Sequence, residues 1–194
     1  MNQFNDIVSL VKENTENNQH VVVAISGFGG SGKSYLADAL ADLFKIKRNQ
    51  VIRIDCLYST NPDGPGVLDQ VDWENLESIL KNIRSGDRLC YQGRGYRGED
   101  LHFDEELPNI VIVEGIRLLQ PRFAPYFDIS IWIDCPQEFA IQRAKVRDRG
   151  QGESEEEVAR WDTHWGPLDK TYFEEYRPDS LATMLFRENG LKKP

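Results

Sequence analysis

Residues 27–34 read Gly-Phe-Gly-Gly-Ser-Gly-Lys-Ser, which matches the spacing G-x-x-x-x-G-K-S of a phosphate-binding loop, or P-loop. Glycines allow the backbone to approach a ligand closely, and successive N–H groups then form a nest for an anion. In this pattern Lys33 is expected to reach the β- and γ-phosphates of a nucleotide, and the Ser34 hydroxyl is expected to bind a magnesium ion. The loop predicts nucleotide binding by Gly27, Gly29, Gly30, Ser31, Gly32, Lys33, Ser34 and Tyr35.

The sequence on both sides of the loop supports this interpretation over that of a glycine-rich turn without a ligand. An apolar, β-branched run at 21–25 predicts a strand, and Leu36, Leu40 and Leu43 recur at helical spacing within 34–44. The motif requires a strand, a glycine loop and a helix in this order, because the helix adds its positive end to the phosphate site. The motif alone does not separate a kinase from an ATPase or a GTPase.

Two acids stand at the ends of predicted strands, Asp55 after the run 50–55 and Glu114 near the end of the apolar run 109–115. The carboxyl ends of strands face the ligand crevice in open α/β sheets, so both acids are expected at that crevice. Asp55 is a candidate general base for a substrate hydroxyl, or a magnesium ligand. Glu114 is expected to hold magnesium or its water near the γ-phosphate. The alternative for each acid is a structural capping role.

A basic cluster within an acidic chain marks the predicted helix 136–149. Arg143 and Arg147 lie four residues apart and therefore share a helix face. Arginines on a closing lid neutralise charge during phosphoryl transfer, so a lid is expected at about 143–157. The alternative is a charged surface helix whose arginines pair with nearby glutamates. The residues expected to be catalytic are Lys33, Asp55, Arg143 and Arg147.

Aromatic and arginine side chains gather on the glycine-rich segment 91–98, and this composition suits a small-molecule site for a planar or anionic ligand. A solvated β-hairpin is the alternative. The turn cluster at 61–66 predicts a mobile loop at the crevice, and Arg117 is expected to face the same crevice. The residues expected to contact a substrate are Tyr58, Tyr91, Arg94, Arg97 and Arg117.

The remaining hydrophobic patterns predict an α/β fold. Helices are expected at 3–17, 73–84 and 155–176, the last kinked at Gly166-Pro167; strands are expected at 128–134 and 180–186, and a polar tail at 187–194.

Length and composition narrow the class of protein. The chain of 194 residues suffices for one α/β domain, so a single domain over 1–194 is expected. The net charge of −9 makes nucleic acid a poor partner, because proteins that bind the phosphate backbone are usually basic. Three widely spaced cysteines without a C-x-x-C motif indicate reduced thiols. The sequence shows no signal-peptide pattern and no apolar run of membrane-spanning length, so a soluble cytoplasmic protein without a membrane partner is expected.

From about residue 20 to residue 186, the chain resembles the uridine kinase-like P-loop kinases of the uridine kinase and phosphoribulokinase superfamily. The resemblance is carried by the P-loop, by Asp-Cys-Leu-Tyr at 55–58 for the family's D-x-F-Y, and by Val-Ile-Val-Glu-Gly at 111–115. Arg143 and Arg147, the latter followed by an aspartate, match the family's lid helix.

This resemblance implies a three-layer α/β/α P-loop kinase fold, with a five-stranded parallel sheet in the order 2-3-1-4-5 and a helical lid over ATP. It implies ATP-dependent phosphorylation of a hydroxyl on a small molecule. Asp55 would then be the base, Ser34 and Glu114 would serve Mg²⁺, and the two lid arginines would clamp phosphates.

The identity of the phosphate acceptor stays open between two classes of molecule, because the chain departs from the family pattern in two places. The segment 91–97 differs from the Tyr-Asp-Phe…His…Arg segment with which uridine kinases hold the nucleoside, and no Arg-Gly-Arg follows Arg147-Asp148. The expected acceptor is a uridine- or cytidine-like nucleoside. The alternative is a sugar or a vitamin precursor such as pantothenate.

A regulatory nucleotide-binding switch and a catalytically silent binding protein are the alternatives outside the kinases. A GTPase is expected to carry N-K-x-D, and the sequence contains no Asn-Lys pair. Its D-x-x-G match at 63–66 lies in a turn cluster rather than after a core strand. Intact Lys33, Ser34, Asp55 and Glu114 argue against a silent protein. The choice between ATP and GTP, and a homo-oligomer, are left open.

Overall fold

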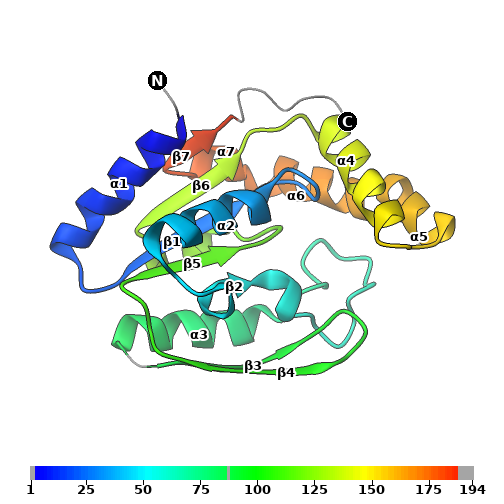
Figure 1. The fold of residues 1–194 in the computed structure, drawn as a ribbon. Helices are drawn as coiled ribbons and strands as arrows, with labels where there is room; N and C mark the ends of the chain where they lie inside the picture. Colours follow the sequence, from blue (N-terminus) through cyan, green and yellow to red (C-terminus); the bar gives the residue numbers. More distant parts are fainter. Residues whose placement is uncertain (1–2, 87, 188–194) are drawn as a thin grey trace.

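The computed structural model describes residues 3–86 and 88–187, and a five-stranded sheet forms its centre (Figure 1). The sheet runs in the order β2-β5-β1-β6-β7, and each strand is parallel to its neighbours. Counted among these strands alone, the order is the predicted 2-3-1-4-5. The strands are β1 (Val21–Ser26), β2 (Ile52–Arg53), β5 (Ile110–Glu114), β6 (Ile129–Ile133) and β7 (Met184–Phe186).

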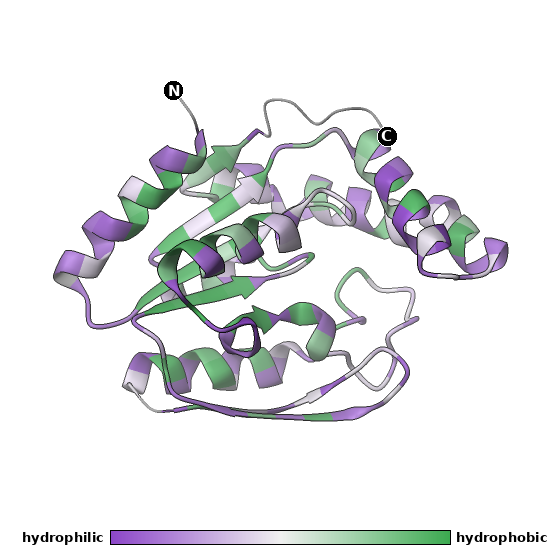
Figure 2. Cartoon of the chain, in the orientation of Figure 1, coloured by the Kyte–Doolittle hydropathy of each residue, from purple (hydrophilic) through white to green (hydrophobic). Residues whose placement is uncertain are grey.

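The central strands form a buried parallel sheet because they are apolar on both faces. Every residue of β1, β5 and β6 is buried, as expected when helices cover the two sides of a sheet. The green of the hydrophobic residues accordingly concentrates in these strands (Figure 2). In the register of the sheet, Glu114 on β5 lies beside Ile25 on β1 and beside Arg53 on β2. An acid is therefore held next to the start of the P-loop.

Helices fill the connections between the strands, and α2 lies in front of the sheet in Figure 1. Helix α3 shows how the predicted amphipathic pattern forms: Asp72 caps its N-terminus by accepting a hydrogen bond from the Asn75 amide at 3.0 Å, and Gly86 ends it at φ 82°. The helices are α1 (Gln3–Asn17), α2 (Lys33–Phe44), α3 (Trp73–Ser85), α4 (Gln137–Gly150), α5 (Glu155–Arg160), α6 (Gly166–Tyr176) and α7 (Pro178–Leu181).

The second strand is shorter than predicted. The run 50–55 forms a strand only at Ile52–Arg53, between the 3₁₀ turns Arg48–Gln50 and Ile54–Cys56. This strand lies at the edge of the sheet and pairs only with β5, and the Leu57 amide bonds back to the Ile54 carbonyl at 2.8 Å. Asp55 therefore lies in the turn that follows the strand.

The predicted helix 155–176 is divided into α5, a π-helical turn at Trp161–Trp165, and α6. The irregularity in this helix lies at Trp161–Trp165, directly before the Gly166-Pro167 pair at which the sequence predicts a kink. Proline cannot donate a backbone hydrogen bond, and the amide of Gly166 reaches back five residues to the Trp161 carbonyl.

The aromatic and arginine-rich segment 91–98 lies in a β-hairpin outside the main sheet. Strands β3 (Leu89–Arg94) and β4 (Asp100–Glu105) pair antiparallel. Leu89 and Tyr91 are buried and alternate with exposed residues, so one face of the hairpin packs against α3. The segment thus forms the hairpin that the sequence left open, and Tyr96 and Arg97 at its turn line the cavity described below.

Other predicted elements keep their place with changed bounds. The last strand is confined to Met184–Phe186, because Pro178–Leu181 forms the short helix α7. The predicted polar tail lies outside the described residues from position 188 onward. Within the described chain, none of the helices has both the length and the apolar character needed to span a bilayer.

The burial pattern of α2 predicts the stability of two matched variants. Leu40 is 1% exposed, whereas Leu43 on the same helix is 49% exposed. We expect Leu40→Ala to lower the free energy of unfolding by about 2–5 kcal/mol, because it leaves a cavity in the core. Leu43→Ala should change it by less than about 1 kcal/mol. Urea denaturation measures both, and equal losses would contradict the placement of α2.

Candidate active site

The P-loop follows β1 and leads directly into α2, as the sequence predicts. Gly30 and Gly32 have φ angles of 81° and 100°, a backbone conformation that other residues rarely adopt. Gly30 also has no room for a side chain, since a Cβ atom there would stand 2.2 Å from the Ala140 carbonyl oxygen of α4. Helix α4 therefore covers one side of the loop closely.

Lys33 is the buried cation of this region, with 8% of its surface exposed. Its Nζ donates a hydrogen bond to the Phe28 carbonyl at 2.9 Å. Burial lowers the pKa of Lys33, and the negative charges of Glu114, Asp55 and Asp169 act to raise it. One ammonium group is thus surrounded by carboxylates from the ends of two strands and from α6.

Glu114 lies beside the first turn of α2, which follows the P-loop. Its Oε1 accepts hydrogen bonds from the Ser34 hydroxyl at 2.9 Å and from Arg53 Nη1 at 2.8 Å. Burial raises the pKa of Glu114, and the positive charge of Lys33 opposes this shift. Arg53 also donates to Asp38 at 2.5 Å, so the carboxylate stands in a fixed network.

The pair of Ser34 and Glu114 has the chemistry of a magnesium site in a phosphoryl-transfer protein. Mg²⁺ prefers oxygen ligands and takes one or two protein oxygens beside phosphates and water. A hydroxyl and a carboxylate within hydrogen-bond distance of each other, next to a P-loop, fit this requirement. Over the described part of the chain, no group of three or more His, Cys, Asp or Glu residues is placed to hold a metal ion by itself. A magnesium ion at Ser34 and Glu114 would therefore need phosphate or water as further ligands.

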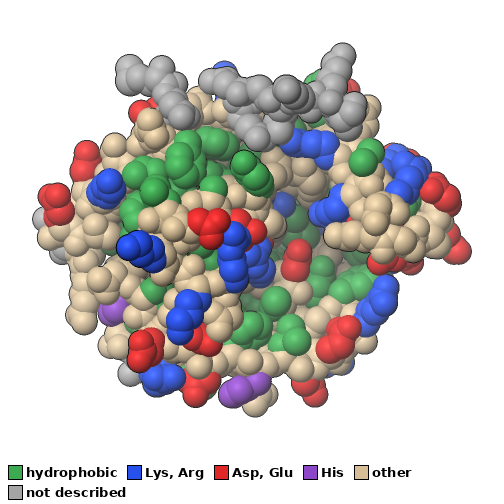
Figure 3. All heavy atoms as spheres, viewed as in Figure 1, with side chains coloured by type: hydrophobic (Ala, Val, Ile, Leu, Met, Phe, Trp, Pro, Cys, Tyr) green, Lys and Arg blue, Asp and Glu red, His purple; other side chains and the backbone are tan. Residues whose placement is uncertain are grey.

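An open cavity of about 910 Å³ joins these groups to the residues of α4, α5 and the hairpin. Figure 3 shows the molecule hollowed here, with charged side chains of both signs around the hollow. Most residues predicted to take part in function line this cavity: Gly29, Gly30, Gly32, Lys33, Ser34, Tyr35, Asp55, Tyr58, Arg97, Glu114, Arg117, Arg143 and Arg147.

Four of the predicted residues are not among those that line the cavity: Gly27, Ser31, Tyr91 and Arg94. Gly27 and Ser31 are buried within the P-loop itself. Tyr91 stacks on Phe103 across the hairpin, with ring centroids 4.5 Å apart, because alternation along β3 turns it toward the buried face. The carbonyl of Arg94 accepts a hydrogen bond from the Tyr58 amide at 3.0 Å, so its backbone joins the hairpin to the core. The expected substrate contact of Tyr91 is therefore corrected, whereas that of Arg94 stays a prediction.

Arg117 lines the cavity, but it is bound within the chain rather than free for a ligand. Only 1% of its surface is exposed, and its Nη2 donates to Asp169 Oδ1 at 3.0 Å. Asp169 Oδ2 in turn accepts a hydrogen bond from the Gly29 amide of the P-loop at 2.9 Å. Arg117 thus faces the crevice as expected, but its guanidinium is held in a buried ion pair, which corrects the expectation that it contacts a substrate.

The two arginines predicted on the lid helix both reach the cavity. Arg143 donates to the Ser31 carbonyl at 3.3 Å, so it lies against the P-loop. Arg147 is half-exposed, forms an ion pair with Asp148 at 2.7 Å, and stands 5.9 Å from the ring centroid of Trp161. The guanidinium groups are therefore placed beside the loop that the sequence predicts to bind phosphate.

Aromatic side chains form one wall of the cavity, here called the aromatic wall (Tyr58, Tyr96 and Trp165). Tyr58 and Tyr96 meet edge to face at 5.3 Å, and Tyr96 meets Trp165 at 6.2 Å. The guanidinium of Arg160 lies 4.3 Å from the Trp165 ring centroid. Gln70 lines the same part of the cavity and is buried.

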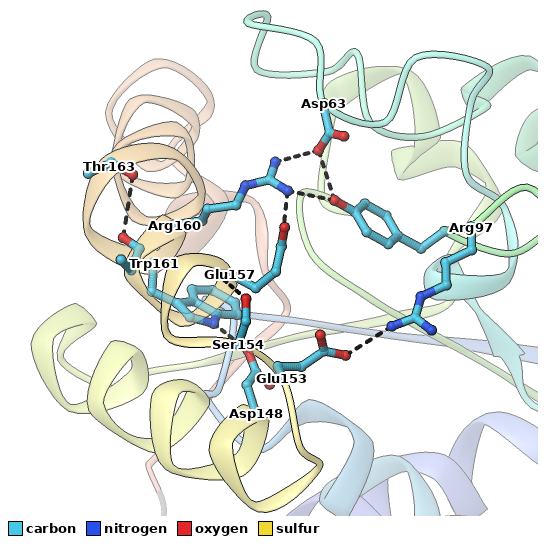
Figure 4. Close-up of polar contacts among 11 residues, drawn as sticks. Asp63, Arg97, Asp148, Glu153, Ser154, Glu157, Arg160, Trp161 and Thr163 are labelled. Carbon is cyan, nitrogen blue, oxygen red and sulfur yellow. Dashed lines mark hydrogen bonds and ion pairs between the residues drawn. The ribbon is translucent and has the colours of Figure 1, made fainter.

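Polar contacts connect the helical arm formed by α4, α5 and the π turn, here called the α4–α5 arm (residues 137–165), to the opposite side of the cavity (Figure 4). Arg160 bonds to Asp63, and it donates to the Tyr96 hydroxyl at 2.7 Å. Arg97 on the hairpin pairs with Glu153 of the arm at 3.4 Å. These contacts hold the arm against the hairpin and the 59–72 loop.

Sequence reasoning missed several residues that line the cavity, namely Gln70, Tyr96, Trp161, Trp165 and Asp169. One signal was present for Asp169. It stands on the apolar stripe of the last long helix, three and four residues from aromatic neighbours, where a buried acid needs a partner. The partner, Arg117, lies 52 positions earlier, and no local pattern points to it.

Comparison with known proteins supports this description. No protein-family model matches the chain. A uridine kinase of Vibrio atlanticus is 30% identical over 155 residues, which cover 69% of this chain and 71% of that protein. A uridine kinase of Streptococcus uberis is 29% identical over 143 residues, covering 66% and 67%. A "putative fructose transport system kinase" from a Silicibacter species superposes with a TM-score of 0.75 at 19% identity, covering 94% and 98%.

A P-loop between the first strand and its helix, on a parallel sheet of this order, defines a P-loop kinase fold. The identity to the Vibrio enzyme over most of both chains places the sequence within one group of these proteins. The chain belongs to the uridine kinase-like family of P-loop kinases, and it is a small-molecule kinase.

The contact between the P-loop and the arm predicts the effect of one added methyl group. A Cβ atom at Gly29 would stand 2.4 Å from the ring of Trp161. We expect Gly29→Ala to lower the free energy of unfolding by about 1–3 kcal/mol through overpacking. The loss should fall below about 0.5 kcal/mol when Trp161 is already alanine, because the clash is then absent.

Urea denaturation of the four proteins of this cycle measures the coupling. Gly150→Ala is the control, because a Cβ atom there meets nothing within 4 Å. An equal cost of Gly29→Ala with and without Trp161 would contradict the contact.

Proposed function

We propose that this protein transfers the γ-phosphate of ATP, with Mg²⁺, to a hydroxyl group of a nucleoside or a related small alcohol. One observation carries the proposal: Lys33, Glu114 and Asp55 line the same cavity as the aromatic wall. A phosphate-binding end and an end suited to a small organic molecule therefore open into one space, and an acid stands between them.

On the donor side, the backbone of the P-loop and Lys33 would bind the β- and γ-phosphates. Ser34 and Glu114 would hold Mg²⁺, directly or through its water, and the ion neutralises charge on the phosphates when it is bound. Arg143 and Arg147 would stabilise the negative charge that builds up on the transferred group. These roles fit the positions of the side chains around the cavity.

On the acceptor side, Asp55 would accept the proton of the attacking hydroxyl. The new bond forms between the acceptor oxygen and the γ-phosphorus, and the bond from that phosphorus to the β,γ-bridging oxygen breaks, so ADP leaves with the bonding electrons. Asp55 is exposed to the cavity and lies beside Tyr58 in sequence and in the cavity lining. Burial raises the pKa of Tyr58, so its hydroxyl stays protonated and is able to orient the acceptor as a donor.

The α4–α5 arm would act as the lid, with residues of about 143–157 closing over the nucleotide. Closure excludes water from the transferred phosphate and completes the set of positive groups. The ion pairs of Arg160 with Asp63 and of Arg97 with Glu153 support this role, because they join the arm to the acceptor side. The Arg97 side chain is 73% exposed and that of Glu153 38%, so this pair contributes little free energy. The Arg160 side chain is only 22% exposed, and its contact with Asp63 would have to break when the lid opens.

A uridine- or cytidine-like nucleoside is the first candidate acceptor. The aromatic edges of Tyr58, Tyr96 and Trp165 suit a planar base, and the named relatives are uridine kinases. A sugar is the second candidate, because Tyr91 turns toward Phe103 and leaves no aromatic side chain of β3 in the cavity.

A panel of nucleosides, sugars and vitamin alcohols, screened for ATP-dependent ADP release and for a phosphorylated product, tests the proposal. A kinase releases ADP in step with phosphorylated acceptor. A nucleotide-binding switch releases ADP at a rate that no acceptor raises, and this result would refute the proposal.

The proposed role of Asp55 predicts a loss of turnover without a loss of nucleotide binding. We expect Asp55→Ala to lower kcat for transfer by about 10²–10⁴-fold, because the general base is removed. ATP affinity measured by calorimetry should change little. Asp104→Ala, an exposed acid of the hairpin, is the control and should retain full activity. Wild-type turnover by Asp55→Ala would remove Asp55 from the mechanism.

The proposed role of Lys33 predicts a loss of nucleotide binding. We expect Lys33→Ala to weaken ATP binding by at least about tenfold, since it removes a buried charge-assisted contact to phosphate. Calorimetry measures the dissociation constant directly. Lys47→Ala serves as the control, because the Lys47 side chain is 69% exposed and pairs with Glu105. Unchanged affinity in Lys33→Ala would contradict its role.

A further inference from the structure

Asp169 and Arg117 form a buried ion pair at the centre of the cavity wall. The side chains are 6% and 1% exposed. Arg117 donates to Asp169 Oδ1 through two nitrogens, Nε at 3.2 Å and Nη2 at 3.0 Å. Two donors on one oxygen, out of water, make a strong and directional contact.

Each partner of this pair also binds a different part of the backbone. Asp169 Oδ2 accepts the amide hydrogen of Gly29 in the P-loop at 2.9 Å. Arg117 Nη1 donates to the carbonyl of Val67 in the 59–72 loop at 2.8 Å. The pair therefore connects the loop that would bind phosphate to the loop on the acceptor side through two side chains.

The 59–72 loop carries parts of the acceptor side of the cavity. Gln70 lines the cavity, and its carbonyl accepts the Ser59 amide at 3.0 Å. Tyr58, directly before the loop, is bridged to Val71 near its end. A shift of Val67 would thus move the groups that surround an acceptor.

The backbone of Arg117 is itself held in an unusual conformation. Its φ angle is 55°, in the left-handed region, which residues with a side chain rarely adopt. Such a conformation persists only where the surroundings fix it, and it is found most often at functional sites. Here the Arg117 carbonyl is held by Gln120 Nε2 at 2.9 Å, so the guanidinium is directed at Asp169 by more than one contact.

We infer that Asp169 and Arg117 are positioning residues that set the distance between the P-loop and the 59–72 loop. This inference rests on the proposed kinase function. In-line transfer requires the acceptor oxygen to stand about 3–3.5 Å from the γ-phosphorus, and a misplacement of about 1 Å costs about 10²-fold in rate. The pair sets this alignment without touching either reactant.

Loss of the pair has a distinct consequence for the reaction. The hydrogen bonds of Lys33 to Phe28 and of Ser34 to Glu114 do not include Asp169, so we expect both to persist when Asp169 is changed. An acceptor that is out of line then leaves the γ-phosphate open to water. More ADP is released for each molecule of phosphorylated acceptor, and this ratio distinguishes lost alignment from a general loss of folded protein.

The test measures ADP and phosphorylated acceptor in the same reaction, with γ-labelled ATP and the full chain. The acceptor is the best one from the panel above. We expect Asp169→Asn to lower the rate of transfer by about 10–100-fold and to raise the ratio of ADP to product clearly above the wild-type value. Glu174→Gln, on the exposed side of α6, is the control and should keep the wild-type rate and ratio.

A second variant separates alignment from stability. Arg117→Met combined with Asp169→Leu removes both buried charges, and such replacements are often neutral or stabilising. We expect this protein to unfold in urea near the wild-type midpoint and still to release excess ADP. A rate that falls while the ratio stays at the wild-type value in both variants would overturn the inference, as would wild-type transfer by either.

Failure of the proposed function gives a different result from failure of this inference. Absence of phosphorylated product from wild-type protein with every acceptor refutes the kinase proposal, and the positioning role falls with it. Transfer by the wild type, together with fully coupled transfer by the variants, leaves the kinase proposal intact and refutes the positioning role alone.

Discussion

Lys33 is a buried cation, and the surrounding structure is arranged to keep it charged and in place. Removing an ammonium group from water is costly unless opposite charges and hydrogen bonds replace the lost hydration. Glu114 ends β5, Asp55 lies in the turn after the neighbouring β2, and Asp169 lies on α6; the Phe28 carbonyl accepts a hydrogen bond from the Lys33 ammonium group. The sheet order contributes to this arrangement, since β5 lies between β1 and β2 and brings its terminal acid beside the loop.

The P-loop is enclosed as well as charged. Helix α4 approaches Gly30 so closely that a methyl group would meet the Ala140 carbonyl, and Trp161 covers Gly29. The glycines of the motif therefore serve two needs, since they leave backbone amides open to an anion and also let the α4–α5 arm lie on the loop. The π turn at Trp161–Trp165 belongs to the same arrangement, because Trp161 rests on the P-loop and Trp165 meets Tyr96 of the hairpin.

The ion pairs around the cavity differ in how far their side chains are buried. Asp169 with Arg117, and Glu114 with Arg53, are buried or half-buried and belong to the rigid body of the protein. Arg97 with Glu153 is an exposed pair that bridges the arm and the hairpin. Buried pairs are costly to break because a charge is left without water, whereas exposed pairs exchange with solvent at little cost. Breaking the buried pairs is thus expected to cost more free energy than breaking the pair of Arg97 with Glu153.

The sequence alone was enough to predict the elements that are held by contacts between residues close in the chain. The P-loop between residues 21–25 and 34–44, the cap and stripe of α3, and the acids after the second and third core strands were predicted because periodicity and turn chemistry act over a few residues. Family resemblance supplied the strand order. The partner of Asp169, the inward stacking of Tyr91 on Phe103, and the contact of Trp161 with Gly29 could not be read in this way. Each joins residues whose separation in the chain carries no pattern, and only packing of the whole fold brings them together, because burial and charge pairing are settled between elements rather than within them.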